Sequence, residues 1–177
     1  RIRFRQKRIQ PFLNLIRNVY QQKGEVRILD LGGTREYWNI FPENFLNECN
    51  VTVTVVNFAS VAFEQQQRIT FYEGNACSLP MLQNNSFDVV HSNSVIEHVG
   101  RWEQMCQFAQ EARRLAPRHW IQTPYYWFPV EPHFMTPFYH WLPWSWRVKM
   151  LQRFDLGNWK RCPNLDDAVR AIESSVL

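Results

Sequence analysis

The sequence predicts an α/β protein with an open, mainly parallel sheet that is flanked by helices. Two runs of apolar and β-branched residues end abruptly in small and polar residues, Arg27-Ile-Leu-Asp-Leu-Gly-Gly-Thr34 and Asn85-Ser-Phe-Asp-Val-Val-His-Ser-Asn-Ser-Val-Ile-Glu-His98. Such runs are typical of buried parallel strands that lead into ligand-binding loops. Strand-like and helical segments also alternate along the chain, as in βαβ units. Because ligands of such sheets bind at the carboxyl ends of the strands, we expect a small-molecule crevice there.

The length and composition predict one domain. The 177 residues are 45% hydrophobic and 15% aromatic, which is enough apolar material for a buried core. The four cysteines are widely spaced and form no C-x-x-C pair, so neither a zinc site nor a disulfide scaffold is indicated. We therefore expect a cytoplasmic protein in a reducing setting. No apolar run approaches the roughly 18 to 20 residues that a bilayer span needs.

Basic residues crowd the start of the chain, although the net charge is only +4. They are Arg1, Arg3, Arg5, Lys7 and Arg8. Such a run usually forms a solvated end, and this is our first interpretation. The alternative is contact with an anionic partner, such as nucleic acid or lipid headgroups.

Periodicity predicts the individual elements in order. Apolar residues recur at helical spacing over 6–22, and Gly24 follows as a stop signal. The clearest second helix is expected over 101–116, where apolar residues repeat on one face. The expected strands are 26–31, 51–56, 69–73, 86–91 and 118–123, and further helical candidates are 147–154 and 165–172.

The segment from Tyr125 to Trp146 has an unusual composition. Ten of its twenty-two residues are aromatic, and five prolines fall between Pro124 and Pro143. Proline fixes φ and lacks a backbone donor, so this segment is expected to be an irregular, stiff connection. We interpret it as a lid or pocket wall over the ligand edge. The alternative, with equal weight, is that its aromatic residues complete the core.

The first loop contains the residues best suited to approach a ligand. Gly32 and Gly33 let the backbone come close without a Cβ clash, and the Asp30 carboxylate at the strand tip can hold an amino group or water. The loop matches neither G-x-G-x-x-G nor G-x-x-x-x-G-K-[ST], which disfavours a dinucleotide or nucleoside triphosphate.

Six motifs together resemble those of class I S-adenosylmethionine-dependent methyltransferases of the small-molecule type, the type 11 family. The resemblance covers roughly residues 25–145. The motifs are Asp30-Leu-Gly-Gly33, Asn57 at the end of the second strand, Gly74-Asn-Ala76, Leu79-Pro80, Ser86-Phe-Asp-Val-Val90 and Asn93-Ser-Val-Ile-Glu-His-Val99. Three further stretches resemble one bacterial subgroup: Gly32-Gly-Thr34, Val55-Val-Asn-Phe58, and Gln122-Thr-Pro124 with Trp127-Phe-Pro-Val-Glu-Pro-His-Phe134.

The resemblance implies a Rossmann-like class I methyltransferase fold and a domain organisation. We expect a single methyltransferase domain over 1–177. It comprises an N-terminal helix (1–24), a cofactor-binding core (25–123), and an aromatic lid with C-terminal helices (124–177). Family members continue to a β-hairpin, with sheet order 3-2-1-4-5-7-6. Only a helix is indicated after Leu165, so we expect this C-terminal hairpin to be truncated.

The resemblance also implies a cofactor, S-adenosyl-L-methionine, and the residues that hold it. The first loop takes the methionine end, Asn57 faces the ribose hydroxyls, Phe58 lies beside the adenine, and Asn75 accepts from the adenine amino group. Asp88 is expected to be structural. The expected cofactor-binding residues are Asp30, Gly32, Gly33, Asn57, Phe58, Asn75, Ala76, Ser92 and Asn93.

The chemistry that the resemblance implies is an in-line displacement at the sulfonium methyl. The protein aligns the acceptor and removes its proton where necessary. His98 is our first candidate base and His133 the second, because an imidazole titrates near neutrality. The alternative for Glu97 and His98 is a helix-capping role. The expected acceptor pocket comprises Glu97, Tyr125, Trp127 and His140.

No metal is expected. Some ubiquinone-pathway O-methyltransferases have a similar Glu-His element that binds metal together with an earlier Glu. Ser94 stands at that earlier position here, which removes a hard oxygen ligand.

Three functional interpretations stay open. The first is an enzyme that methylates a small acceptor, for which the aromatic segment favours an apolar or amphiphilic molecule. The second is a non-catalytic or truncated binding module, supported by amides where the family usually has acids. The third is a nucleic-acid methyltransferase, which the absence of an Asn/Asp-Pro-Pro-Tyr/Phe element disfavours. A small-molecule partner is expected, with peripheral membrane contact and dimerisation as open alternatives.

Overall fold

A five-stranded parallel sheet forms the centre of the protein. The computed structural model describes residues 2–58 and 68–174. Its neighbouring strands run in the order β3-β2-β1-β4-β5, and all four pairings are parallel, which confirms the predicted Rossmann-like fold. The strands are β1 (Val26–Leu31), β2 (Val51–Asn57), β3 (Ile69–Glu73), β4 (Val89–Asn93) and β5 (His119–Gln122).

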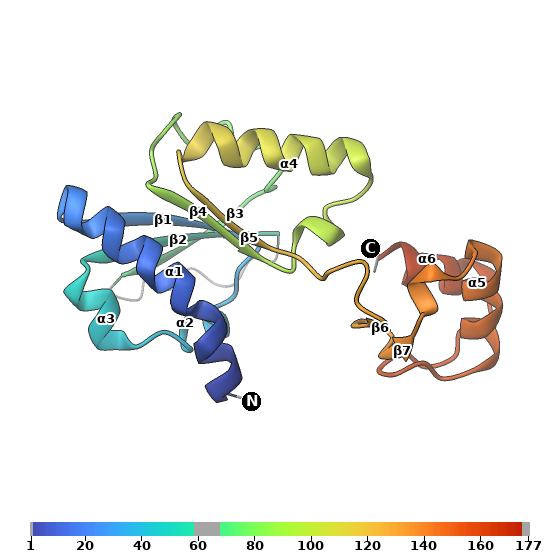
Figure 1. Cartoon of the computed structure of the whole chain (residues 1–177). Helices are drawn as coiled ribbons and strands as arrows, with labels where there is room; N and C mark the ends of the chain where they lie inside the picture. The colour runs from blue at the N-terminus through green and yellow to red at the C-terminus, as the bar shows by residue number, and fades with distance from the viewer. Residues whose placement is uncertain (1, 59–67, 175–177) are drawn as a thin grey trace.

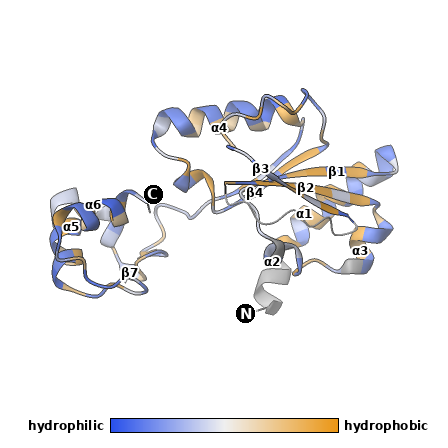
Figure 2. Cartoon of the chain, turned by 180° about the vertical axis from the view of Figure 1, so that it is seen from behind, coloured by the Kyte–Doolittle hydropathy of each residue, from blue (hydrophilic) through white to orange (hydrophobic). Residues whose placement is uncertain are grey.

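Helices cover both faces of this sheet (Figure 1). One face carries α1 (Ile2–Lys23), α2 (Arg35–Trp38) and α3 (Glu43–Glu48), and the other carries α4 (Trp102–Leu115). Side chains of a strand alternate between the faces. Ile28 therefore belongs to the core beneath α1, whereas Leu29 packs in the core beneath α4. The apolar strands stand out between more hydrophilic helix surfaces in Figure 2.

Two elements have boundaries that differ from those expected. The helix expected over 6–22 extends from Ile2 to Lys23. The strand expected over 86–91 begins only at Val89. Asp88, just before it, is completely buried; it pairs with Lys23 and accepts a hydrogen bond from the Arg27 amide at 2.8 Å. These contacts confirm the structural role expected for Asp88.

The C-terminal segment has a small hydrophobic core of its own. It comprises the hairpin strands β6 (Val130–Glu131) and β7 (Thr136–Pro137), a 3-10 turn η2 (Tyr139–Trp141), α5 (Trp144–Arg153) and α6 (Leu165–Glu173). This group lies to one side of the sheet (Figure 1). Its core residues are Phe134, Tyr139, Val148, Leu151, Leu156, Ala168, Ala171 and Ile172.

The aromatic segment is divided between this core and the surface. Phe134 and Tyr139 are buried, and their ring centroids lie 4.6 Å apart. Tyr125 and Trp127 are about two-thirds exposed, at 70% and 66%. Some of the aromatic residues therefore do complete a core, but it is the core of the C-terminal group.

Among the described residues, no helix combines the length and apolar content needed to cross a bilayer.

Candidate functional site

Two cavities lie at the carboxyl ends of the strands. The first, which we call the α4-side cavity, has a volume of about 230 Å³. Its walls come from the ends of β1, β2 and β3 and from the segment after β4. The lining residues are Gly32, Val56, Asn57, Phe58, Gly74, Ala76, Ser94, Val95, His98 and Val99.

Close contacts between the loop after β1, the end of β2 and the segment after β4 shape the α4-side cavity. Asn57 Nδ2 donates to the carbonyl oxygens of Gly33 at 3.0 Å and of Gly32 at 3.4 Å. Gly32 has a φ of +75°, and an added Cβ there would lie 2.5 Å from a Val95 methyl. Only glycine therefore lets this loop turn so close to Val95. The Asn57 donor is engaged, which leaves its amide oxygen as the group for a ligand hydroxyl.

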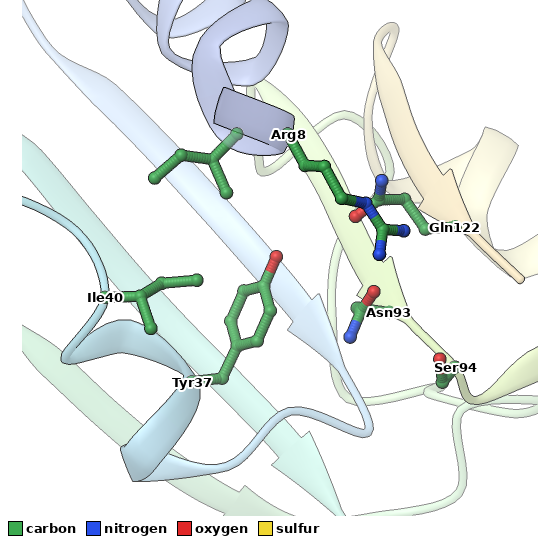
Figure 3. Close-up of a pocket in the computed structure, with 7 residues that line it drawn as sticks. Arg8, Tyr37, Ile40, Asn93, Ser94 and Gln122 are labelled. Atoms are coloured by element: carbon green, nitrogen blue, oxygen red, sulfur yellow. The ribbon is translucent and has the colours of Figure 1, made fainter. Parts of the chain in front are cut away.

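The second cavity, the α1-side cavity, lies on the opposite face and also measures about 230 Å³. Its lining includes Arg8 from α1, Tyr37 from α2, Asn93 from β4 and Gln122 from β5 (Figure 3). Arg8 supplies a positive charge and the other three supply hydrogen-bonding groups. The remaining lining residues are Ile9, Ile40 and Ser94.

Ser94 belongs to both cavities. It follows β4 directly, and its backbone has a φ of +56°, a conformation that residues other than glycine rarely adopt. Its amide donates to the Gln122 carbonyl at 2.8 Å, which holds the turn against the neighbouring strand. The two cavities therefore meet at a strained turn, and such strain concentrates at functional sites.

A buried polar network lies beneath the α1-side cavity. Asp30 Oδ1 lies 2.7 Å from His91 Nδ1, and Asp30 Oδ2 accepts from Trp38 Nε1 at 2.6 Å. His91 Nε2 lies 3.1 Å from the Tyr37 hydroxyl. Asp30 and His91 are 0% and 1% exposed, so a buried carboxylate and imidazole connect, through Tyr37, to the cavity. An added Cβ at Gly33 would lie 1.8 Å from Asp30 Oδ2.

The structure distributes the predicted cofactor-binding residues unevenly. Four of them, Gly32, Asn57, Phe58 and Ala76, line the α4-side cavity, and Asn93 lines the α1-side cavity. The remaining four lie outside the two described linings. They are Asp30, Gly33, Asn75 and Ser92.

Three of these four side chains already have protein partners. Asp30 is fully buried and already holds His91 and Trp38. Ser92 is equally buried, and its hydroxyl donates to the Leu31 carbonyl at 2.9 Å. Asn75 Oδ1, expected to accept from adenine, accepts from the Cys77 amide at 2.9 Å. In each case a protein group holds the side chain, and the predicted cofactor contacts stay predictions.

The two predicted bases come together, although 35 positions separate them. His98 ends the 3-10 turn η1 (Ile96–His98), and its Nε2 lies 3.3 Å from Nε2 of His133. His98 Nδ1 lies 2.6 Å from the Ser174 carbonyl, and His133 Nδ1 lies 2.7 Å from Glu131 Oε1. The Nε2 edges of the two rings therefore meet, with the ring planes at 83°, where the segment after β4 contacts the C-terminal group.

The predicted acceptor residues are dispersed. Glu97 is buried, and its Oε2 accepts from the Thr123 hydroxyl at 3.1 Å. His140 is buried within the C-terminal group, where its Nε2 contacts the Tyr126 carbonyl at 2.7 Å. Tyr125 and Trp127 point to solvent. Within the described part of the chain, none of the four predicted residues lines either cavity. The lid or pocket-wall role expected for the aromatic segment stays a prediction.

Apart from Asn93, none of the residues of the α1-side cavity was assigned to the crevice from the sequence. Gln122 could have been found, because it lies next to the end of the strand expected over 118–123 and ligands bind at that edge. His91 is a polar residue within an apolar strand, directly opposite Asp30 in the sheet register, and this was also a usable signal. Arg8 and Tyr37 carry no such signal, because only the packing of α1 and α2 brings them to the edge.

The parallel order β3-β2-β1-β4-β5, with its crevice at the carboxyl edge, defines an α/β protein of the class I methyltransferase fold. Residues 29–118, about half of the chain, match the family model described as a methyltransferase domain, type 11. The chain therefore belongs to this family of S-adenosylmethionine-dependent methyltransferases. The comparison with curated protein sequences found no match.

Solved structures with similarity to the chain include two described as SAM-dependent methyltransferases. The one from Archaeoglobus fulgidus is 16% identical, with a TM-score of 0.48, and the match covers 66% of this chain and 48% of that one. The one from Aquifex aeolicus is 13% identical, with a TM-score of 0.41 and 57% of each chain covered. The trans-methyltransferase CalH in complex with SAH is 15% identical, with a TM-score of 0.45 and coverages of 59% and 32%. The chain thus spans from about a third to somewhat over half of these structures.

Proposed function

We propose that the protein transfers a methyl group from S-adenosylmethionine to a small acceptor. The observation that carries this proposal is the pair of cavities on opposite faces of the sheet, which meet at Ser94. In a displacement at a sulfonium, the acceptor atom bonds to the methyl carbon as the bond from that carbon to sulfur breaks, so sulfur and acceptor must lie on opposite sides of the carbon. Two cavities that share one turn of the backbone supply that arrangement.

The cofactor occupies the α4-side cavity in this proposal. Phe58 is 66% exposed at its rim and can stack on the adenine. The Asn57 amide oxygen accepts from a ribose hydroxyl, while its donor holds the first loop. Gly32 leaves room for the methionine end. Asp30 supports this loop from beneath, because Gly33 packs directly on its carboxylate.

The acceptor occupies the α1-side cavity. Arg8, Tyr37, Asn93 and Gln122 all converge on this space (Figure 3). A guanidinium beside amides and a phenol favours a polar or anionic acceptor, because Arg binds carboxylates and phosphates through several donors. The lining therefore favours a different acceptor class from the apolar one that the aromatic segment suggested.

Tyr37 is the group best placed to receive the acceptor's proton. Asp30 accepts only, so His91 Nδ1 carries the hydrogen of that contact and Nε2 presents a lone pair to the Tyr37 hydroxyl. Tyr37 can pass its proton to His91 as its oxygen takes the proton of the acceptor. Asp30 then stabilises the charged imidazole, which is the logic of a base oriented by a third group.

Calorimetric titration with S-adenosylmethionine, and separately with S-adenosylhomocysteine, tests the cofactor site. Val99→Trp should fill the α4-side cavity and abolish binding, since Val99 lines it. Phe58→Ala should weaken binding about fivefold to tenfold through lost stacking. Trp102→Ala is the matched control, because it removes an exposed aromatic residue outside the described lining of this cavity. Absence of binding by the folded wild-type chain contradicts the proposal.

A turnover assay separates the enzyme from the non-catalytic alternative. Release of S-adenosylhomocysteine in the presence of polar and anionic small acceptors supports methyl transfer. Tight cofactor binding without turnover on any acceptor class favours the binding module. A nucleic-acid acceptor predicts binding that weakens steeply with salt. The basic side chains before Arg8 lie outside those that the structure describes, so nucleic-acid, membrane and dimer contacts stay predictions.

A further inference from the structure

Glu97, His98 and His133 form a cluster that the proposed methyl transfer does not use. Glu97 and His98 lie in η1, directly after β4, and His133 lies in the loop between β6 and β7. One potential metal-ligand atom from each residue lies within 4.8 Å of those of the other two. The fold therefore brings two imidazoles and a carboxylate together from separate parts of the chain.

The neighbours of the two histidines determine their tautomers. His98 Nδ1 faces the Ser174 carbonyl at 2.6 Å, and His133 Nδ1 faces the Glu131 carboxylate at 2.7 Å. Both partners are acceptors, so both Nδ1 atoms carry hydrogen. In the neutral rings, each Nε2 is then a lone-pair donor, and the two Nε2 atoms face each other at 3.3 Å. Two lone pairs in this position repel each other unless a shared proton or a metal ion lies between them.

The separation fits a bound metal ion. Zinc binds imidazole nitrogen at about 2.0–2.1 Å in tetrahedral geometry, which places two such nitrogens about 3.3–3.4 Å apart. The observed distance is 3.3 Å. Glu131, which is 2% exposed, holds the far nitrogen of His133. A carboxylate behind a metal-bound histidine is a recurrent support for such sites.

Glu97 supplies an independent observation. It is 3% exposed, its Oε2 accepts from Thr123, and its Oε1 is buried without a hydrogen-bond partner among the described residues. A buried carboxylate oxygen without a partner costs free energy. Coordination of a cation beside the two histidines removes this cost. It requires the Glu97 carboxylate to move closer to His98 and His133 than its present position.

We propose that Glu97, His98 and His133 bind one divalent ion of the zinc type. The donor set of two imidazoles and one carboxylate suits zinc and neighbouring transition metals better than magnesium. Three protein ligands leave a fourth position open. The ion joins the β6–β7 loop to the end of β4 at the rim of the α4-side cavity, which His98 also lines. This site departs from the expectation of no metal.

The test uses the untagged chain after treatment with a chelator. Calorimetric titration with Zn²⁺ should show one equivalent bound, and Co²⁺ should give the intense visible absorption of a four- or five-coordinate ion. His98→Ala, His133→Ala and Glu97→Gln should each weaken binding by about 100-fold or more. His119→Ala is the matched control, since His119 is an exposed histidine on β5 whose Nε2 contacts the Ala112 carbonyl. It should bind like the wild type.

Glu131→Gln tests the support behind His133. It coordinates nothing in this proposal, so it should weaken Zn²⁺ binding by only about 10- to 100-fold and leave the stoichiometry at one. Circular dichroism shows whether each variant is folded. The proposal is overturned if the folded wild type binds no stoichiometric Zn²⁺, which leaves a shared proton between the histidines. It is also overturned if the folded His133→Ala variant binds like the wild type.

Discussion

Asp30 on β1 and His91 on β4 lie directly opposite each other in neighbouring strands, and their side chains form a fully buried pair. Asp30 Oδ1 lies 2.7 Å from His91 Nδ1, while Trp38 Nε1 donates to the other carboxylate oxygen. Removal of one member of such a buried pair is strongly destabilising, because the other loses its partner. The pair thus anchors both the first loop and Tyr37.

Asp30→Asn should separate the role of this pair in stability from its role in proton transfer. The oxygen of the introduced amide can accept from Trp38, and its amino group can donate to His91 Nδ1 if the imidazole changes tautomer. All groups then stay paired, so the loss in free energy of unfolding should be only about 1–2 kcal/mol. His91 Nε2 becomes a donor, however, and cannot take a proton from Tyr37. Turnover should fall about 100-fold or more.

Asp88→Asn is the control for this variant. Asp88 is equally buried, and it pairs with Lys23 and the Arg27 amide at the opposite ends of the strands. Urea denaturation should show a loss of similar size, with turnover unchanged. Equal turnover in the Asp30→Asn variant and the wild type would mean that the Asp30, His91 and Tyr37 network does not move the proton.

Tyr37→Phe should affect the chemical step without weakening cofactor binding. The change removes only the hydroxyl that contacts His91 and that faces the α1-side cavity. We expect kcat to fall by about 100-fold, with the Kd of S-adenosylmethionine unchanged, because Tyr37 lies outside the described lining of the α4-side cavity. Steady-state kinetics and calorimetry provide the two values. A parallel loss of cofactor affinity would mean that Tyr37 contributes to the cofactor site and would contradict its assignment to the acceptor site.

Gly33→Ala should destabilise the first loop. The new Cβ would lie 1.8 Å from the Asp30 carboxylate, which cannot move without losing His91 and Trp38. We expect the free energy of unfolding to fall by about 2–3 kcal/mol. Gly24→Ala is the control: its φ is +75°, but an added Cβ meets no atom within 4 Å. It should cost about 1 kcal/mol from backbone strain alone, and equal losses would disprove the steric explanation.

Glu111 should make stability depend on acid pH. Two hydrogen bonds from the Arg114 side chain, at 2.8 Å each, and one from the Leu79 amide hold its carboxylate. The Arg114 hydrogen bonds lower the pKa of Glu111 below its ordinary value of 4.5. The folded state thus favours the ionised form. Its contribution is complete at neutral pH and is lost as the pH falls through the folded pKa.

Glu111→Gln isolates this contribution. At pH 7 the variant should be less stable than the wild type by about 1–2 kcal/mol, as measured by urea denaturation. The difference should shrink steadily below the ordinary pKa of 4.5, because the wild-type carboxyl is then protonated too. A difference that stays constant down to acid pH would show that the ionised form carries no special stability.

The sheet could be predicted from the sequence because each strand is marked by a pattern of residues that are close together along the chain. Buried parallel strands read as continuous apolar runs, and β1 was found with its observed bounds, Val26–Leu31. The loop after it was found because Gly32 and Gly33 have no substitute in so tight a turn. The start of β4 was misplaced: Val89 begins the strand, and the Asp88 side chain just before it is held by Lys23 and by the Arg27 amide, which are distant along the chain.

The candidate site was predicted only in part, for a related reason. A motif shows which residues reach the carboxyl edge, but not toward which face each side chain points or which protein group already binds it. Ser92 and Asn75 were expected to touch the cofactor, and only the structure shows that they also bond to a carbonyl and an amide of the protein. The α1-side cavity was missed, because α1 supplies Arg8 and α2 supplies Tyr37.

The sequence by itself determined the parallel α/β sheet, the glycine turn after β1 and the family to which the chain belongs, since each depends on residues close together along the chain. Tertiary structure alone decided that Asp30 lies buried against His91, that the α1-side cavity opens beside Ser94, and that His98 faces His133. These relationships join residues that are far apart along the chain. They depend on how helices and strands pack, and the chemistry of the separate residues does not specify that packing.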